Sequence, residues 1–181
     1  MSWRHPLRRL RGEGGYSLIE MLTVMVIMGV VMSGLTTVFV SASNSELDLN
    51  NRFQAQLSSR LALDKFRREV HCASSVTLNS TSSVTVVLPS GCKSSGTVTW
   101  CAQGSGTRWG LYRVSGSSCS GGVKWIDYLI QSNLFNYTAP AAGSRILPKV
   151  NVDFPVNVKP VKTTETYELK DDVVLRNGTR A

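Results

Sequence analysis

The sequence is poor in the side chains that most enzymes use for chemistry. Its 181 residues include only two histidines, His5 and His71, and charged residues make up 18%, below the roughly 25% of typical soluble domains. It has no glycine-rich phosphate loop, no H-E-x-x-H pair and no acidic calcium loop. His71 alone would have to supply any histidine-based triad, and it suits a helix C-terminus better, where a cation is favourable. We therefore expect no catalytic residue, no metal or other cofactor, and no small-molecule substrate.

Helix-breaking residues are also missing from the first half of the chain. Proline is absent between Pro6 and Pro89, and glycine is absent between Gly34 and Gly91. Residues 21–40 carry no charge, and twenty helical residues reach ~30 Å, the thickness of the hydrocarbon core of a bilayer. Positive charge stays on the cytoplasmic side of a membrane, and four arginines precede this run: Arg4, Arg8, Arg9 and Arg11. The pattern predicts a single pass through the inner, cytoplasmic membrane, with the N-terminus cytoplasmic and the rest extracytoplasmic.

One acidic residue, Glu20, lies inside the apolar segment 16–40. An acidic side chain at mid-bilayer costs ~2.5 to 3.5 kcal/mol, by analogy with aspartate. Two interpretations stay open from position alone. Glu20 either pairs with a partner in an assembly or is solvated at the level of the lipid headgroups.

The stretch from Gly14 to Leu22, G-G-Y-S-L-I-E-M-L, resembles the processing signal of type IV prepilins and type II secretion pseudopilins. In that family a short basic leader ends in glycine, an aromatic residue follows, and glutamate is fifth in the mature chain. Gly15, Tyr16 and Glu20 take those places. The resemblance implies that prepilin peptidase cuts between Gly15 and Tyr16 and N-methylates Tyr16. It further implies a structural subunit that leaves membrane lipid to join other pilin or pseudopilin subunits in a filament or at the cell surface.

The resemblance is physically coherent, because cleavage would create a cationic amine on Tyr16 within reach of a neighbouring subunit's Glu20. Such a buried pair specifies register in an assembly more than it adds net stability. Tyr16 replaces the commoner phenylalanine, and the proline that many major pilins carry in this helix is absent. Leu111-Tyr112-Arg113 and Leu175-Arg176-Asn177 resemble segments of minor pilins or minor pseudopilins.

Two other functions remain open on the sequence. A conventional signal peptide would end in Val40-Ser41-Ala42, so that a secreted β-rich protein cut after Ala42 is one alternative. The other is a filament-borne module for adhesion or DNA binding, although scattered solvated charges explain the basic residues as well. The conceivable phosphate contacts are Arg67, Arg68, Lys93, Arg108 and Arg113.

Four cysteines, with no C-x-x-C and no paired histidines, do not form a zinc pattern. An even count after an export-type N-terminus predicts two disulfides, and three pairings are possible. Buried free thiols remain the alternative if this region stays in the cytosol. A helix-to-loop tie and a strand-to-loop tie are the preferred pattern: Cys72 with Cys92 and Cys101 with Cys119.

Residues 45–73 predict an amphipathic helix that lies on a sheet. Leu49, Phe53, Leu57 and Leu61 recur every four residues, and Phe66, Val70 and Ala73 continue the series. We expect these residues to face the sheet. The opposite side should face solvent with its charged residues: Asp48, Arg52, Arg60, Lys65, Arg68 and Glu69.

Alternating apolar residues after Cys72 predict strands near residues 84–88, 98–100, 108–114, 123–130, 150–158, 166–169 and 173–176. Pro155 places the fifth of these at a sheet edge or bulge. The fold class is therefore α+β, with a long N-terminal helix packed on an antiparallel sheet, as in pilins. We expect four regions: a leader at 1–15 that is removed, a transmembrane or filament-core helix at 16–41, an amphipathic helix at 42–73, and an extracytoplasmic β-rich domain at 74–181.

Overall fold

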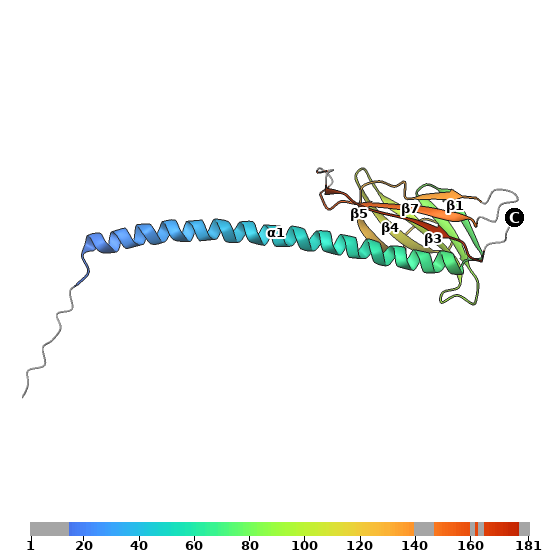
Figure 1. The fold of residues 1–181 in the computed structure, drawn as a ribbon, viewed down its shortest axis with the longest axis horizontal. Coiled ribbons are helices and arrows are strands. Elements are labelled where there is room, and N and C mark those ends of the chain that lie inside the picture. Colours follow the sequence, from blue (N-terminus) through green and yellow to red (C-terminus); the bar gives the residue numbers. More distant parts are fainter. Residues whose placement is uncertain (1–14, 140–146, 160–161, 163–164, 178–181) are drawn as a thin grey trace, which may run out of the picture. The chain divides into compact units, whose positions relative to one another are not determined.

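The computed structural model describes residues 15–139, 147–159, 162 and 165–177. Within them one long helix accompanies an antiparallel sheet, which confirms the predicted α+β class (Figure 1). The helix and strands, in chain order, are α1 (Leu18–Cys72), β1 (Ser75–Ser80), β2 (Ser83–Leu88), β3 (Gly96–Ser105), β4 (Arg108–Ser115), β5 (Val123–Leu129), β6 (Phe135–Thr138), β7 (Lys149–Val156) and β8 (Tyr167–Val174).

The helix begins and ends where its backbone groups find partners. The Ser17 carbonyl accepts hydrogen bonds from the amides of Glu20 and Met21, at 2.9 and 3.1 Å. At the other end the Asn177 side chain donates to the Cys72 carbonyl at 3.3 Å, which satisfies one of the free carbonyls of the last turn. The chain divides into two compact units between Leu47 and Asp48, and each unit is described separately below.

The sheet has the strand order β1-β2-β3-β4-β5-β7-β6, and β8 pairs with β7 outside this path. A single residue pair, Leu129 with Val156, connects β5 to β7. The sheet curls, because the Thr81 carbonyl between β1 and β2 accepts hydrogen bonds from the amides of Leu134 and Phe135 at 2.8 and 2.9 Å. This contact brings the two ends of the strand order together.

The core of the second unit is aromatic where the helix meets the sheet. The Phe66 ring lies 5.8 Å from Trp100 in an edge-on arrangement and 5.6 Å from Phe135. Phe135 in turn meets Phe154 edge-on at 6.2 Å. Since edge-to-face pairs at these distances are favourable beyond their buried area, Phe66 is the main anchor of the helix on the sheet.

The predicted sheet-facing side of the helix is wrong in its first half. Leu49, Phe53, Leu57 and Leu61 are exposed, whereas the buried residues of the helix are Ala55, Ser59, Ala62, Leu63, Phe66, Glu69 and Val70. Trp125 from β5 lies beside Ala55 and Ser58 of the helix, where small side chains leave room for its large ring.

The predicted edge position of Pro155 is also wrong. Strand β7 is internal, since it pairs with β8 along its whole length and with β6 from Lys149 to Val152. Pro155 accepts a hydrogen bond from the Ile130 amide on the side facing β5 and β6. On that side the β6 ladder has already ended and β5 contacts only Val156. The missing N–H of the proline therefore falls in a gap between two neighbouring strands.

The two short strands predicted at 166–169 and 173–176 form the single strand β8. Its two aspartates point to different partners, as expected for neighbours in a strand. Asp171 pairs with Arg67 of the helix at 2.6 Å, and Asp172 pairs with Lys149 of β7 at 2.7 Å.

Candidate functional site

The predicted processing residues lie just before the helix. Gly15, Tyr16 and Ser17 have no regular secondary structure, and α1 starts at Leu18. Among the described residues beyond its chain neighbours, no atom lies within 4 Å of the position that a Cβ on Gly15 would occupy, and Tyr16 is 78% exposed. The Gly15–Tyr16 peptide bond is thus accessible and outside the hydrogen-bonded helix.

Glu20 occupies the first turn of α1, three residues after Ser17. Ser17 and Glu20 have the spacing of a capping box, a helix-start signal that the sequence analysis overlooked. A carboxylate in the first turn is favoured by the positive end of the helix dipole. Within the described chain the Glu20 side chain is exposed and makes neither a hydrogen bond nor an ion pair. Its carboxylate is free to accept a partner from outside the chain.

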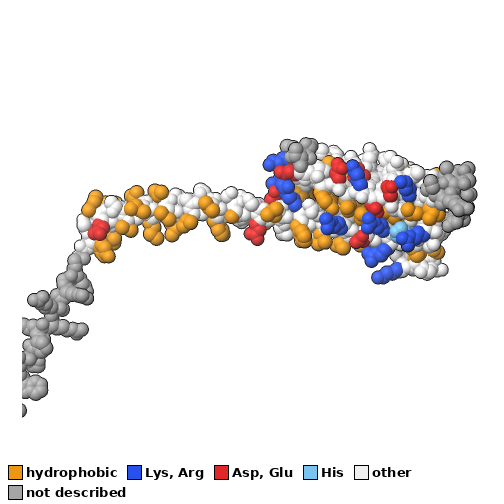
Figure 2. Space-filling model, in the orientation of Figure 1, with side chains coloured by type: hydrophobic (Ala, Val, Ile, Leu, Met, Phe, Trp, Pro, Cys, Tyr) orange, Lys and Arg blue, Asp and Glu red, His pale blue; other side chains and the backbone are white. Residues whose placement is uncertain are grey.

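The first unit exposes an unusual amount of apolar surface. Residues 18–40 are exposed throughout, and α1 is long and apolar enough to cross a membrane. In Figure 2 hydrophobic side chains dominate this part of the helix. Because contiguous apolar surface of this extent is not left in water by soluble proteins, the segment requires lipid or other protein chains around it.

Both disulfides have the pairing predicted from the sequence. Cys72, at the end of α1, is bonded to Cys92 in the loop between β2 and β3. Cys101 of β3 is bonded to Cys119 in the loop between β4 and β5. Each bridge therefore fastens a glycine- and serine-rich loop to a regular element.

A buried carboxylate, Glu69, joins the helix to the sheet. Its side chain is 4% exposed, although the sequence analysis placed it on the solvent side. One oxygen accepts a hydrogen bond from Trp100 Nε1 at 2.8 Å. The other pairs with Arg113 of β4 at 2.9 Å and with Lys65 at 3.0 Å. Two cations balance the charge and the indole N–H satisfies the second oxygen, where water is excluded.

Several of the five basic residues considered as phosphate contacts are engaged within the protein itself. Arg113 is largely buried against Glu69, and Arg67 pairs with Asp171 and Asp64. Arg108 stacks on the Tyr128 ring at 4.9 Å. Of the five residues, Arg68 and Lys93 line one small cavity of about 120 Å³. The structure therefore does not gather the five into one basic surface.

A row of polar contacts fastens the flank of α1 to β8. Arg60 donates to the Tyr167 hydroxyl at 3.3 Å, and Arg67 binds Asp171. His71 donates from Nδ1 to the Val174 carbonyl at 2.9 Å. His71 is thus engaged in covering a strand edge. Among the described residues, no three histidine, cysteine or acidic side chains are grouped to hold a metal ion.

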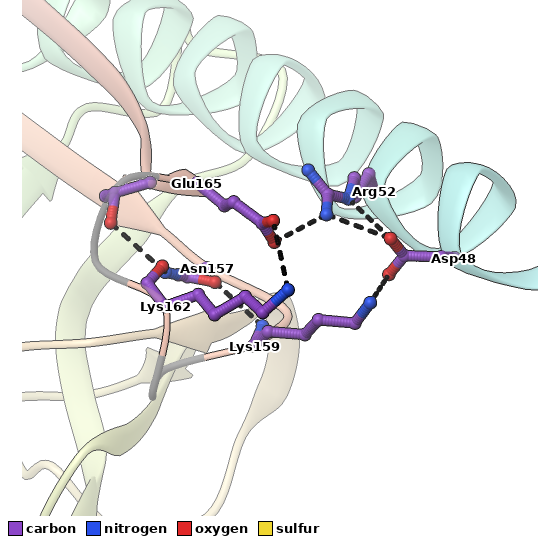
Figure 3. Close-up of polar contacts among 7 residues, drawn as sticks. Asp48, Arg52, Asn157, Lys159, Lys162 and Glu165 are labelled. Carbon is purple, nitrogen blue, oxygen red and sulfur yellow. Dashed lines mark hydrogen bonds and ion pairs between the residues drawn. The ribbon is translucent and has the colours of Figure 1, made fainter. Parts of the chain in front are cut away.

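The row begins with an ionic cluster between the first turns of this unit and the loop that follows β7 (Figure 3). Asp48 accepts from Arg52 and from Lys159, both at 2.9 Å, and Arg52 also reaches Glu165 at 2.5 Å. These cations, Lys159 first and then Arg52, hold the pKa of the Asp48 carboxyl below its ordinary value. The Asn157 amide braces the loop by donating to the Lys162 carbonyl at 2.8 Å.

Comparison with known proteins identifies one motif. Residues 10–36 match the family model of the prokaryotic N-terminal methylation motif. No curated protein and no solved structure matches the chain significantly. The motif, together with the long apolar helix after it, supports a type IV pilin-like protein that prepilin peptidase processes. It implies a structural protein that assembles with other pilin subunits, and it is consistent with membrane anchoring and a surface filament.

Proposed function

We propose that the protein is a minor pilin or minor pseudopilin, a non-enzymatic subunit of a type IV pilus or a type II secretion-like filament. The observation that carries the proposal is the exposed apolar segment of α1 with one carboxylate in its first turn, Glu20, that has no partner among the described residues. A structural subunit requires that combination, because neighbouring chains must supply both the apolar surroundings and the counter-charge.

The proposed division of the chain follows from this role. Residues 1–15 are a cytoplasmic leader that is removed, and residues 16–41 hold the protein in the inner membrane before assembly. Residues 42–73 and 74–181 form the extracytoplasmic part, with its two disulfides. Bonds of this kind form in oxidising compartments outside the cytosol, which supports the proposed orientation.

Cleavage between Gly15 and Tyr16 is the processing event we propose, followed by N-methylation of Tyr16. The peptide bond lies in an accessible non-helical segment. Ala42, after which a secretory signal peptide would be cut, lies inside α1. The intact mass and N-terminal residue of the protein from membranes of its own host decide between cleavage after Gly15 and cleavage after Ala42. A chain of 166 residues starting at methylated Tyr16 supports the proposal, whereas 139 residues starting at Ser43 would overturn it.

Glu20 is proposed to pair with the Tyr16 amine of a neighbouring subunit. Glu20→Val should still be processed and inserted but should be lost from filaments. Glu46→Val is the matched control, because Glu46 is another exposed glutamate on the same helix. Both variants are compared by their recovery in sheared filaments against their recovery in membranes. Normal incorporation of Glu20→Val would show that the assigned role is wrong.

A further inference from the structure

Strands β6, β7 and β8 form one wall of a cavity of about 500 Å³, a volume within the ~300 to 1,000 Å³ of small-molecule sites. Three of its lining residues, Leu134, Phe135 and Val152, are apolar, but their side chains are at most 3% exposed and belong to the core. The other lining residues are polar or charged. The cavity therefore offers hydrogen-bonding side chains in place of the apolar ones that usually predominate in ligand pockets.

The strand pattern gathers these polar side chains on one face of the sheet. Successive side chains of a strand point to opposite faces, so Asn151 and Asp153 of β7 point away from the core that their buried neighbours fill. In the register, Asn136 of β6 and Asp172 of β8 lie on either side of Asn151, and Lys170 lies opposite Asp153. Polar side chains from three strands thus share one surface.

Contacts within the protein hold the rim and the floor of the cavity in place. Thr81 donates from Oγ1 to Asn133 Oδ1 at 2.8 Å, and its carbonyl is bound by the two amides at the start of β6 and just before it. On the strands, Asn151 donates to Asp172 and accepts from Thr138 at 3.0 Å. A site whose side chains are already fixed loses less entropy when a ligand binds.

Three other polar groups at the cavity have no partner within the described chain. Asp153 Oδ1 is buried and accepts no hydrogen bond there. The Asn136 side chain makes none among the described residues, and the Asn133 amide nitrogen donates none to them. Burial raises the pKa of the Asp153 carboxyl, and the charge of Lys170 opposes this only in part. Since a buried acceptor without a donor is costly, a ligand that donates to Asp153 removes that cost.

The charges at the cavity are balanced within the protein. Each of its three carboxylates has a cation of the chain as partner: Arg67 with Asp171 at 2.6 Å, Lys149 with Asp172 at 2.7 Å, and Lys170 with Asp153 at 3.6 Å. An anionic ligand would be repelled by three carboxylates, and a cationic one would compete with the internal partners. A neutral ligand with several hydroxyl groups avoids both costs, because a hydroxyl donates to a carboxylate and accepts from an amide N–H.

We infer that this cavity binds a neutral carbohydrate, with Asp153, Asn133 and Asn136 as its hydrogen-bonding residues. The inference goes beyond the proposed function, since assembly of a pilin-type subunit requires no ligand. It gives a chemical class of ligand to the adhesion role that the sequence leaves open. The cavity lies entirely in the second unit, so processing at Gly15 and the role of Glu20 do not depend on it.

The experiment applies the full chain, labelled and kept in a detergent without a sugar headgroup, to an array of immobilised neutral, sialylated and sulfated glycans. A sugar-based detergent would itself compete for the cavity. The chain should bind neutral glycans, and the free methyl glycoside of their terminal sugar should displace it. Binding to acidic glycans alone, or to none of the array, would overturn the inference.

A substitution in the cavity shows whether the bound glycan lies there. Asp153→Asn keeps the size of the side chain but replaces an acceptor oxygen with an amide, and should weaken the affinity for the neutral glycan by about tenfold or more. Asp127→Asn is the matched control, because Asp127 also pairs with a lysine but lies on β5, outside the cavity. Equal affinity of Asp153→Asn and the wild type would place the glycan elsewhere and contradict the inference.

Thermal unfolding midpoints separate loss of binding from loss of the fold. If Asp153→Asn unfolds at a lower temperature than Asp127→Asn, the exposed residue Asn136 decides, and Asn136→Ala should weaken glycan binding several-fold at an unchanged midpoint. Unchanged affinity of that variant would then reject the site. The proposed function is tested apart from this, because Asp153→Asn should still be cleaved after Gly15 and enter filaments. A chain that binds no glycan but is processed normally would remove only the present inference.

Discussion

Glu69 and Trp100 are joined by a hydrogen bond of 2.8 Å across the interface between helix and sheet, with both side chains buried. The indole N–H and the carboxylate come from residues 31 positions apart. Arg113 and Lys65 complete the site by balancing the charge of Glu69. Because its partners come from the helix and from two strands, this buried polar centre fixes the position of α1 along the sheet.

Removing the carboxylate should therefore destabilise the fold strongly. Glu69→Ala leaves Trp100 Nε1 without an acceptor and Arg113 without a counter-charge, and breaking a buried pair in this way costs about 3 to 5 kcal/mol. The measurement is chemical denaturation of the full chain in detergent, followed by tryptophan fluorescence. The control is Glu168→Ala, whose exposed pair with Lys170 is screened by solvent and should contribute little. Equal effects of the two substitutions would show that Glu69 has no special role.

The helix face that packs on the sheet gives a second prediction from two adjacent residues. Ala62 is completely buried and Leu61 is 52% exposed. Ala62→Leu should overpack the interface between helix and sheet and cost about 1 to 3 kcal/mol. Leu61→Ala should change the free energy of unfolding by no more than about 0.5 kcal/mol. The same denaturation measurement compares the two variants. A larger loss of unfolding free energy for Leu61→Ala than for Ala62→Leu would show that the face predicted from the sequence packs on the sheet after all.

Much of the fold follows from local patterns in the sequence. The long helix was predictable from an uninterrupted stretch without proline or glycine, and most strands were predictable from alternation of apolar residues. The loop positions of Cys92 and Cys119 favoured the pairing that the structure contains. These features depend on residues close in sequence, where periodicity and turn chemistry carry the information.

The errors share a different cause, since each depends on contacts between distant residues. Leu49 and Phe53 have the spacing of a packed face, but the helix buries the side that carries Ala55, Ser59 and Ala62 instead. Glu69 has the i, i+4 spacing to Lys65 of a surface pair, and nothing local reveals that Trp100 and Arg113 enclose it. The S-x-x-E spacing of Ser17 and Glu20 is the exception, because this helix-start signal is local and was present in the sequence.

The disulfides should contribute a large share of the stability of the β-rich part. Closing loops with sequence separations of 20 and 18 residues stabilises the fold by roughly 3 kcal/mol per bridge in the chain-entropy account. We expect the double substitution Cys101→Ala and Cys119→Ala to lower the free energy of unfolding by about this amount. Adding reductant to this variant should then lower the free energy of unfolding only by the contribution of the remaining bridge, Cys72–Cys92. A variant as stable as the wild type would show that the bridge constrains little of the unfolded chain.

The ionic cluster around Asp48 predicts how stability depends on pH. Lys159 and Arg52 lower the pKa of Asp48 from its ordinary value of 3.8. A carboxyl whose pKa is lower in the folded state contributes stability above the unfolded value, and this contribution is lost as pH falls through the folded pKa. The wild type should therefore lose more stability than Asp48→Asn as pH is lowered below about 4, while Asp48→Asn is the less stable protein at neutral pH.

Substitution of the first partner provides the control for this mechanism. Lys159→Gln keeps the Asp48 carboxyl but removes the cation that lowers its pKa most. It should weaken the same acid transition, and added salt should have a smaller effect on it than on the wild type, since exposed pairs are screened. Stability is measured by denaturant titration at a series of pH values. Identical pH dependence of the wild type and Asp48→Asn would mean that the cluster in Figure 3 forms without stabilising the attachment of helix to loop.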